Sequence, residues 1–289
     1  MDAANSGIGM SYAPLLFYKE EIMSKGSEYF SQIEPLLLKQ SSDEIEQLLL
    51  FNSNLPGSRA NLELAYAFAD HFSNDLNTYS WDLLQRFLNV ELDSDPHNSP
   101  AEFLPVCALV ALGSYYIKAE SPIQEQIVSL LWEFANNSNW RLREAVAMAF
   151  QRIEEQDFGL ISSLFNERIK DASLLEMRAI IAALAHPPIL KHEPNAVFCL
   201  EASEIVLNKV VSLDVSERKT EEFRVLRKGL EYAVSVFVAS LPAEGFAFLT
   251  KWAKANDADI KKILRSNLGK SRLTKKYEEQ VEKVLCLLK

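Results

Sequence analysis

The sequence predicts an all-α fold, an α–α superhelix in which successive pairs of helices stack into a solenoid. The first observation is that apolar residues follow a helical period almost throughout, with no convincing alternating run that would indicate a strand. The second is that one pattern returns at offsets typical of a two-helix repeat. Composition agrees, because 48% of the 289 residues are hydrophobic and only nine are glycine, which excludes collagen-like and fully disordered chains.

Start signals divide the chain into helix pairs. Ser121-Pro122 and Leu241-Pro242 place proline at the first helical position, and Ser58 precedes a long apolar-periodic run. A final helix is expected from about 273 to 288, one or two helices before residue 40, and an exposed loop at 91–100. The expected pairs are 42–51 with 58–73, 79–90 with 100–118, 122–136 with 138–154, 157–169 with 173–186, 195–212 with 217–240, and 242–255 with 257–269.

The pairs are repeats of one another. Shifts of 35, 84 and 118 residues carry Leu142-Arg143 onto Met177-Arg178, Leu226-Arg227 and Ile260-Lys261. Second helices are therefore expected every 34 to 48 residues, and each pair leaves an apolar face that the next pair covers. We expect an N-terminal segment with capping helices at 1–40 and a single solenoid domain at 41–289. The alternative, two four-helix bundles, predicts no common period.

The counts of cysteine and histidine exclude several classes of protein. Cys107, Cys199 and Cys286 are too few and too scattered for a disulfide framework, which indicates a reducing compartment. None of them has zinc-site spacing, the four histidines are isolated, and no phosphate loop or dinucleotide motif occurs, so we expect no metal and no cofactor. No apolar run reaches the roughly 18 residues of a membrane span, and we expect a cytoplasmic protein without membrane contact.

Charge is unevenly distributed along the chain. The formal net charge is −10, which argues against a general affinity for nucleic acid. Residues 251–289 are the exception, because they carry 11 basic and 5 acidic residues. This cluster is interpreted either as a solvated helical face or as a local patch for an anion or phosphate.

The repeat pattern resembles a known superfamily. An apolar residue followed by Arg or Lys stands early in each second helix, after a turn that contains Asn139, Asp171 or Asp257. This arrangement resembles HEAT repeats, over roughly residues 40–270, and implies an armadillo-type helical solenoid.

Three segments look like one branch of that superfamily, the HEAT-like repeat DNA alkylation repair proteins (the AlkD family). They are Asn139-Trp140-Arg141-Leu142-Arg143-Glu144, Leu174-Leu175-Glu176-Met177-Arg178-Ala179, and residues 223–234 with Arg227-Lys228 and Tyr232. The resemblance implies a concave groove for duplex DNA and removal of cationic alkylated purines. The resemblance implies that Glu144 stands at the position of the catalytic acid, which is normally Asp, and that Arg178 matches the active-site Arg. Trp140 matches a Trp of the family, and Tyr232 stands where the family has another Trp.

Spacing shows how these residues could share one surface. Trp140 and Glu144 are one helical turn apart, and Arg178 lies one repeat after Arg143, hence near Glu144 on the neighbouring helix. An acid, a cation and two aromatic rings suit a cationic purine. The structural alternative is also open: Glu144 with Arg178 as an ion pair between repeats, Trp140 over a turn, Tyr232 in the core, and an Arg that binds turn carbonyls.

A non-catalytic binding scaffold is the leading functional hypothesis, with a concave groove for a protein or nucleic-acid partner. The alternative is an alkylpurine DNA glycosylase or damaged-DNA binder. Glutamate in place of aspartate lengthens the acid by a methylene, and a misplacement of about 1 Å can lower a rate on the order of 10²-fold. The discriminating feature is whether six cations converge on the groove: Arg143, Arg178, Arg227, Lys228, Lys261 and Lys262.

No known chemistry requires the sequence of residues 54–63. Residues 54–63 contain Pro56-Gly57, which makes a tight turn, and Ser58, which is expected to cap the next helix. The stretch is either an inter-helix turn or a binding loop at the solenoid rim.

Overall fold

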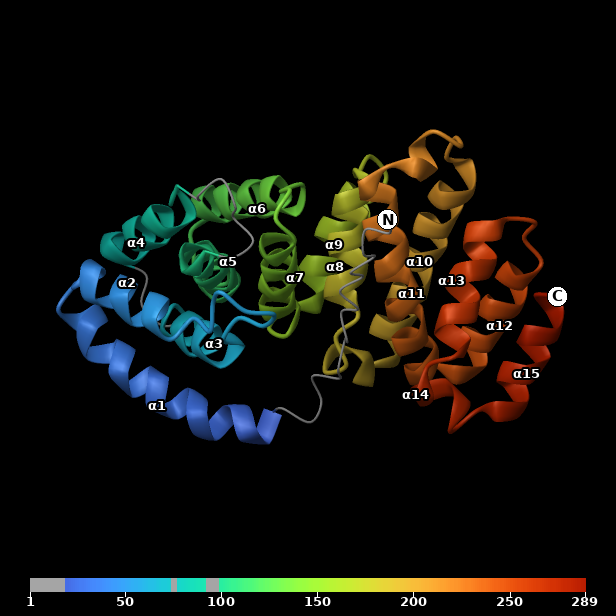
Figure 1. The fold of residues 1–289 in the computed structure, drawn as a ribbon, viewed down its shortest axis with the longest axis horizontal. Coiled ribbons are helices and arrows are strands. Elements are labelled where there is room, and N and C mark those ends of the chain that lie inside the picture. Colours follow the sequence, from blue (N-terminus) through green and yellow to red (C-terminus); the bar gives the residue numbers. More distant parts are fainter. Residues whose placement is uncertain (1–18, 74–76, 92–98) are drawn as a thin grey trace, which may run out of the picture.

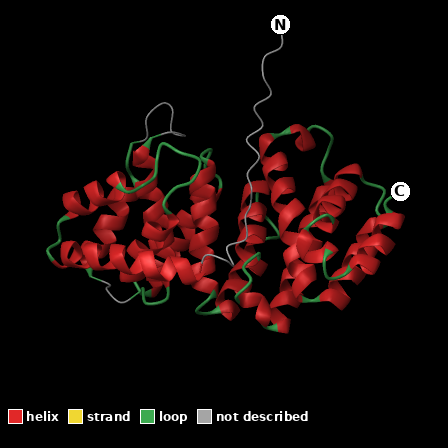
Figure 2. Cartoon of the chain, turned by 60° about the horizontal axis from the view of Figure 1, so that its bottom comes forward, coloured by secondary structure: helices red, strands yellow, loops and turns green. Residues whose placement is uncertain are grey.

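The computed structural model describes residues 19–73, 77–91 and 99–289, and the regular structure in these ranges is entirely helical (Figure 2). The predicted all-α fold is therefore confirmed. Part of the predicted loop at 91–100, including His97, lies outside the described residues.

The helices follow one another along the chain with short connections between them. Three 3₁₀ turns, η3 (Pro100–Glu102), η4 (Ile189–Lys191) and η5 (Glu217–Lys219), precede α5, α10 and α11. The α-helices of the described residues are α1 (Lys19–Leu38), α2 (Ser42–Phe51), α3 (Leu62–His71), α4 (Thr78–Leu88), α5 (Phe103–Tyr116), α6 (Ser121–Ala135), α7 (Trp140–Glu154), α8 (Phe158–Arg168), α9 (Leu174–Leu184), α10 (Glu193–Ser212), α11 (Glu221–Ser240), α12 (Pro242–Ala253), α13 (Ala258–Leu268), α14 (Ser271–Thr274) and α15 (Glu278–Leu287).

The second helices of the pairs form a continuous ladder. Each of α1, α3, α5, α7, α9, α11 and α13 packs against the next, and Figure 1 shows them in succession from one end of the molecule to the other. The helices α3 to α13 of this ladder begin at residues 62, 103, 140, 174, 221 and 258, so the predicted repeat period is confirmed. Because α1 joins the same ladder, the boundary at residue 40 stays a prediction.

The first half of the ladder is built around α5. All residues of α5, Phe103–Tyr116, are buried, and α2, α3, α4, α6 and α7 surround it. A helix that is apolar on every side needs such an enclosure. Gly113 allows α5 to approach α7 closely, because a Cβ atom there would lie 2.3 Å from the carbonyl oxygen of Ala149.

Side-chain caps set where the second helices begin. Asn139 caps α7 and Asp257 caps α13, as the turn residues predicted. The helix α3 begins at Leu62, later than the expected start at residue 58. Asn61 and not Ser58 caps α3, because its side chain accepts from the Leu64 amide while its amide group donates to the Asn52 carbonyl. Ser173 caps α9 within one residue of the expected start, and Glu176 completes a capping box with it.

Candidate functional site

The structure brings Glu144 and Arg178 into contact across two neighbouring second helices. Glu144 stands in the second turn of α7 and Arg178 in the second turn of α9, so the equivalent caps at Asn139 and Ser173 place them at matching levels. The Arg178 Nη2 donates to Glu144 Oε1, and its Nη1 donates to the carbonyl of Arg143 at 3.1 Å. The guanidinium therefore ties the backbone and a side chain of α7 to α9.

This pair is enclosed on one side. The Arg178 side chain is 6% exposed, and its stem lies against Gly229 of α11, where an added Cβ would be 3.4 Å from Cγ. The Glu144 side chain is 31% exposed. A buried guanidinium needs both an opposite charge and hydrogen-bond acceptors, and Glu144 and the Arg143 carbonyl supply them. The geometry is that of an ion pair between repeats that leaves part of one carboxylate at the surface.

Trp140 lies beside a second network of hydrogen bonds, which is more deeply buried. The Arg141 guanidinium carbon lies 4.6 Å from the centroid of the Trp140 ring. Arg141 donates to Glu102 Oε2 at 3.0 Å and to the Gly57 carbonyl at 2.6 Å. Glu102 is fully buried, and its other oxygen accepts from the Asn139 side chain at 2.9 Å. Trp140 thus packs against a buried ion pair, which the sequence did not identify.

The same network explains the stretch 54–63. Arg141 of α7 holds the turn through the Gly57 carbonyl, 84 residues away in sequence. At Gly57 a Cβ atom would lie 2.5 Å from the Asn54 carbonyl oxygen, so the turn needs glycine there. Ser58 and Arg59 are exposed. This stretch is an inter-helix connection anchored to the core by a buried arginine.

Two cations lie over the ring of Tyr232 in α11. The Arg272 guanidinium carbon lies 4.6 Å from the Tyr232 ring centroid, and Lys270 Nζ lies 6.0 Å from it. Both cations come from the segment around α14, which packs on α11. Tyr232 follows Gly229 by three residues, so one helical turn separates the Arg178 contact from this cation-covered ring.

Three of the six predicted cations are used inside the fold. Arg143 donates to the carbonyls of Asn137 and Ser138 at 2.6 and 2.7 Å, as the structural alternative for this repeat position proposed. Arg178 holds Glu144. Arg227 Nη1 lies 3.2 Å from a carboxylate oxygen of Asp259.

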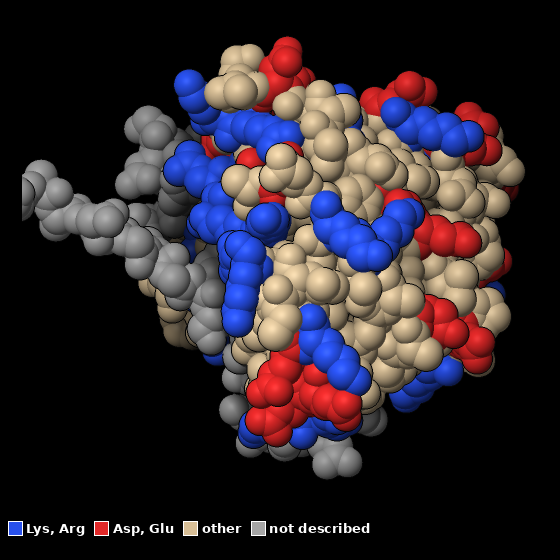
Figure 3. Space-filling model, turned by 90° about the vertical axis from the view of Figure 1, so that its right-hand side faces the viewer, with Lys and Arg blue, Asp and Glu red and all other residues tan. Residues whose placement is uncertain are grey.

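The other three cations lie at the surface. Lys228 and Lys262 are exposed and Lys261 is half-buried. No carboxylate of the described residues forms an ion pair with Lys228, Lys261, Lys262, Lys270 or Arg272. Figure 3 looks onto the C-terminal end of the molecule and shows lysine and arginine side chains gathered in a band along one side.

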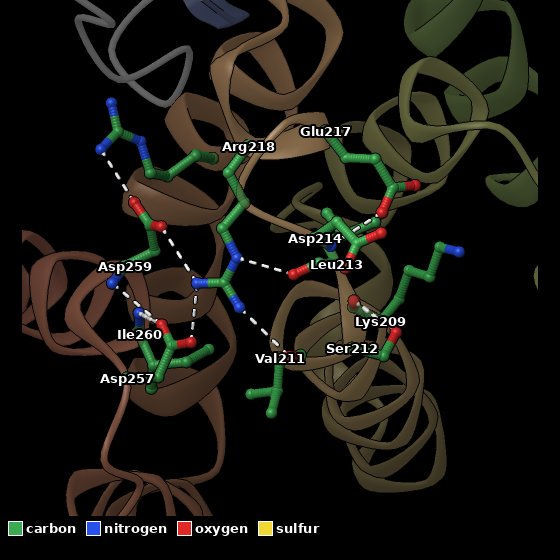
Figure 4. A network of polar contacts seen from close by, with 11 residues as sticks. Lys209, Val211, Ser212, Leu213, Asp214, Glu217, Arg218, Asp257, Asp259 and Ile260 are labelled. Atoms are coloured by element: carbon green, nitrogen blue, oxygen red, sulfur yellow. Dashed lines mark hydrogen bonds and ion pairs between the residues drawn. The ribbon is translucent and has the colours of Figure 1, made fainter.

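Sequence reasoning missed an arginine that joins two repeats. Arg218, from η5, donates through Nε to the Leu213 carbonyl and through Nη2 to the Val211 carbonyl, each at 3.1 Å. Its Nη1 reaches Asp257 at 2.7 Å and Asp259 at 3.2 Å (Figure 4). The hydrogen bonds and charges of the two aspartates, Asp257 first, raise the pKa of Arg218. A signal existed, because two acids flank the start of α13.

A buried acid in α7 was missed as well. Glu154 is 2% exposed, and neither carboxylate oxygen has a hydrogen-bond partner among the described residues. Burial, and then the charge of Glu155, raises the pKa of Glu154 well above its usual value. The sequence carries no signal for this, because Glu154-Glu155 reads as an exposed helix end.

The described residues contain neither a metal site nor a membrane-spanning helix. No group of three or more His, Cys, Asp and Glu side chains there is arranged to hold a metal ion. Within the same residues, no helix has the length and apolar character needed to cross a bilayer.

Comparisons with known proteins add little to this geometry. No protein-family model matches the sequence, and comparison with curated proteins found no match. Among solved structures, the chain is similar to the designed armadillo repeat protein YIII(Dq)4CqI, at 15% identity and a TM-score of 0.29, over 76% of this chain and 97% of that one. The fold class therefore rests on this chain's own helices.

Proposed function

We propose that this chain is a non-catalytic binding scaffold that takes an anionic partner, an acidic protein segment or DNA, on its last repeats. The binding surface is a cationic face formed by Lys228, Lys261, Lys262, Lys270 and Arg272. The observation that carries the proposal is that these cations have no ion-pair partner among the described residues, whereas Arg143, Arg178 and Arg227 are all bound within the fold.

The packing of α11, α13 and α14 supports treating these cations as one face. Lys228 precedes Tyr232 by one turn of α11, and Lys270 and Arg272 lie over the Tyr232 ring. Lys262 precedes Ser266 by one turn of α13, and the Ser266 hydroxyl donates to the Glu231 carbonyl of α11 at 3.1 Å. That bond aligns the two helices, so Lys262 stands beside the turn of α11 that carries Lys228.

The electrostatics favour an anion there in spite of the acidic total. Residues 251–289 carry 11 basic and 5 acidic residues, in a chain whose net charge is −10. Screening limits the reach of each charge to about 8–10 Å at physiological salt, so a partner on this face meets mainly the local excess. The acidic remainder disfavours contact elsewhere.

Binding of two labelled polyanions, duplex DNA and polyglutamate, tests the proposal. We expect the triple variant Lys228→Glu, Lys261→Glu and Lys262→Glu to weaken binding at least about tenfold, and binding of the unmodified protein to weaken as salt rises. The control reverses Lys191, Lys209 and Lys219, which are exposed, so the net charge is the same. Equal loss in both variants, or no binding of either polyanion, would overturn the proposal.

The contact between Glu144 and Arg178 favours a second candidate, an alkylpurine DNA glycosylase or damaged-DNA binder. The Glu144 carboxylate is partly exposed, and a carboxylate can stabilise the positive charge that develops on a sugar, while Arg178 holds it in position. The test is a duplex with a single N7-methylguanine. Base release above the spontaneous rate that is lost in Glu144→Gln supports an enzyme, and binding without release supports a damaged-DNA binder. Neither binding nor release would leave only the scaffold.

A further inference from the structure

A groove lies between α10 and α12, away from the cationic face. It has a volume of about 520 Å³, and its apolar lining is Val197, Leu200, Ile205, Leu241 and Phe248. Val197 and Ile205 are each 37% exposed, although both are large apolar side chains. They lie eight residues apart on one side of α10, which corresponds to ~12 Å, or about two helical turns. The groove therefore offers apolar surface over the length of a short helical segment.

The rim of the groove is acidic. Three glutamates line it, and the single lining cation, Lys251, is bound to one of them, Glu204, at 2.5 Å. The other Glu204 oxygen accepts from Trp252 Nε1 at 2.8 Å, so both oxygens of Glu204 are bound within the fold. Glu201 and Glu244 are exposed and form no ion pair with any described residue. The rim thus keeps two negative charges beside an apolar floor.

We infer that this groove binds a basic amphipathic helix of another protein. Apolar residues on one side of such a helix would rest on Val197, Ile205 and Phe248, while lysines or arginines on its flanks would meet Glu201 and Glu244. Charge complementarity selects a basic helix over an acidic one. The groove belongs to the first helices α10 and α12, whereas the cationic face belongs to α11, α13 and α14, so the inference does not depend on the proposed function.

The experiment uses the full chain and a designed peptide of leucine and lysine, with leucines at i, i+3, i+4 and i+7. A scrambled peptide of the same composition controls for attraction to an acidic protein. We expect the helical peptide to shift the isoleucine methyl resonance of Ile205, and to bind at least about tenfold more tightly than the scrambled one. The methyl resonance of Ile45, in α2, should stay in place.

Two variants locate the contact. Ile205→Asp removes the apolar centre of the groove, and Glu201→Lys with Glu244→Lys reverses its rim, and each should weaken peptide binding at least about tenfold. Val211→Asp is the matched control, because Val211 is a 45% exposed apolar residue of α10 that does not line the groove.

Three results would overturn the inference. The first is equal binding of the two peptides, and the second is equal loss in Ile205→Asp and Val211→Asp. The third is a wild-type chain that self-associates and becomes monomeric in Ile205→Asp, because the groove would then hold a second copy. All three leave the polyanion result on the cationic face unaffected.

Discussion

The two halves of the ladder differ in one kind of charge: a buried ion pair lies at the start of α5, whereas lysines without an ion-pair partner among the described residues stand on α11 and α13. Glu102 and Arg141 are 0% and 6% exposed and bind each other, a turn and the cap of α7. Lys228 and Lys262, which the repeat offsets of 84 and 118 residues align with Glu144, are exposed. The same two-helix unit therefore serves as a closed core around α5 and as an open surface around α11 and α13.

The largest effect that tests this comparison is expected from Glu102→Ala. It leaves the Arg141 guanidinium buried without its carboxylate and should lower the free energy of unfolding by about 3–5 kcal/mol. Urea denaturation measures this. In the second half of the ladder, Arg218→Ala should lower the free energy of unfolding less, by about 1–2 kcal/mol, because solvent can replace part of the contacts of Arg218. Equal losses would remove the distinction between the two halves.

The double variant Glu102→Leu with Arg141→Met sharpens the result. Apolar replacement of both members of a buried pair can be neutral or stabilising, so the double variant should unfold at a higher urea concentration than Glu102→Ala. A double variant as unstable as the single one would mean that losing the Arg141 bond to Gly57, which Glu102→Ala keeps, costs as much stability as the unpaired buried charge.

Alanine substitutions at two glycines, one in each half of the ladder, should change stability in opposite directions. Gly113→Ala places a methyl group 2.3 Å from the Ala149 carbonyl oxygen, which is backbone, and should destabilise by about 1–3 kcal/mol. Gly229→Ala meets the Arg178 side chain at 3.4 Å, an ordinary contact, and should stabilise by about 0.5–1 kcal/mol through helix propensity. Thermal unfolding of both variants checks the pair. Destabilisation by Gly229→Ala would mean that the second half is packed as tightly as the first.

The stability of the chain should also depend on pH through Glu154. Burial raises the pKa of this carboxyl above 4.5, so the folded protein keeps a proton that the unfolded chain releases. The contribution of this proton to the free energy of unfolding is fully present below pH 4.5, and it declines as the pH rises toward the pKa of Glu154 in the folded state. Glu154→Gln does not titrate, so the variant should lose less stability than the unmodified protein between about pH 5 and 8. Urea midpoints at both pH values measure this, and equal pH slopes for the two proteins would contradict it.

Much of the fold could be predicted, because apolar periodicity and the turn residues Asn139 and Asp257 act locally. The contact of Arg178 with the Arg143 segment also followed from the repeat offset of 35 residues. The Arg141 bond to Gly57 could not be predicted, since it joins residues 84 positions apart that share no motif. For Tyr232, the repeat offset gave its place along α11 but not the cations over its ring, which come from the non-repeat segment around α14.

The smallest expected effect on stability is that of reversing Lys262, and it distinguishes a lysine that stabilises the fold from one that serves a binding partner. Lys262 has like charges near it and no carboxylate partner among the described residues, so Lys262→Glu should leave stability within about 0.5 kcal/mol, on the stabilising side. Lys283→Glu, by contrast, should destabilise, because it breaks the pair with Glu279 at 2.7 Å. Melting temperatures of both variants at low salt measure this. A stabilised Lys262→Glu that has lost polyanion binding would show that this lysine is retained for binding at the expense of stability. A destabilised one would make Lys262 structural and remove it from the cationic face.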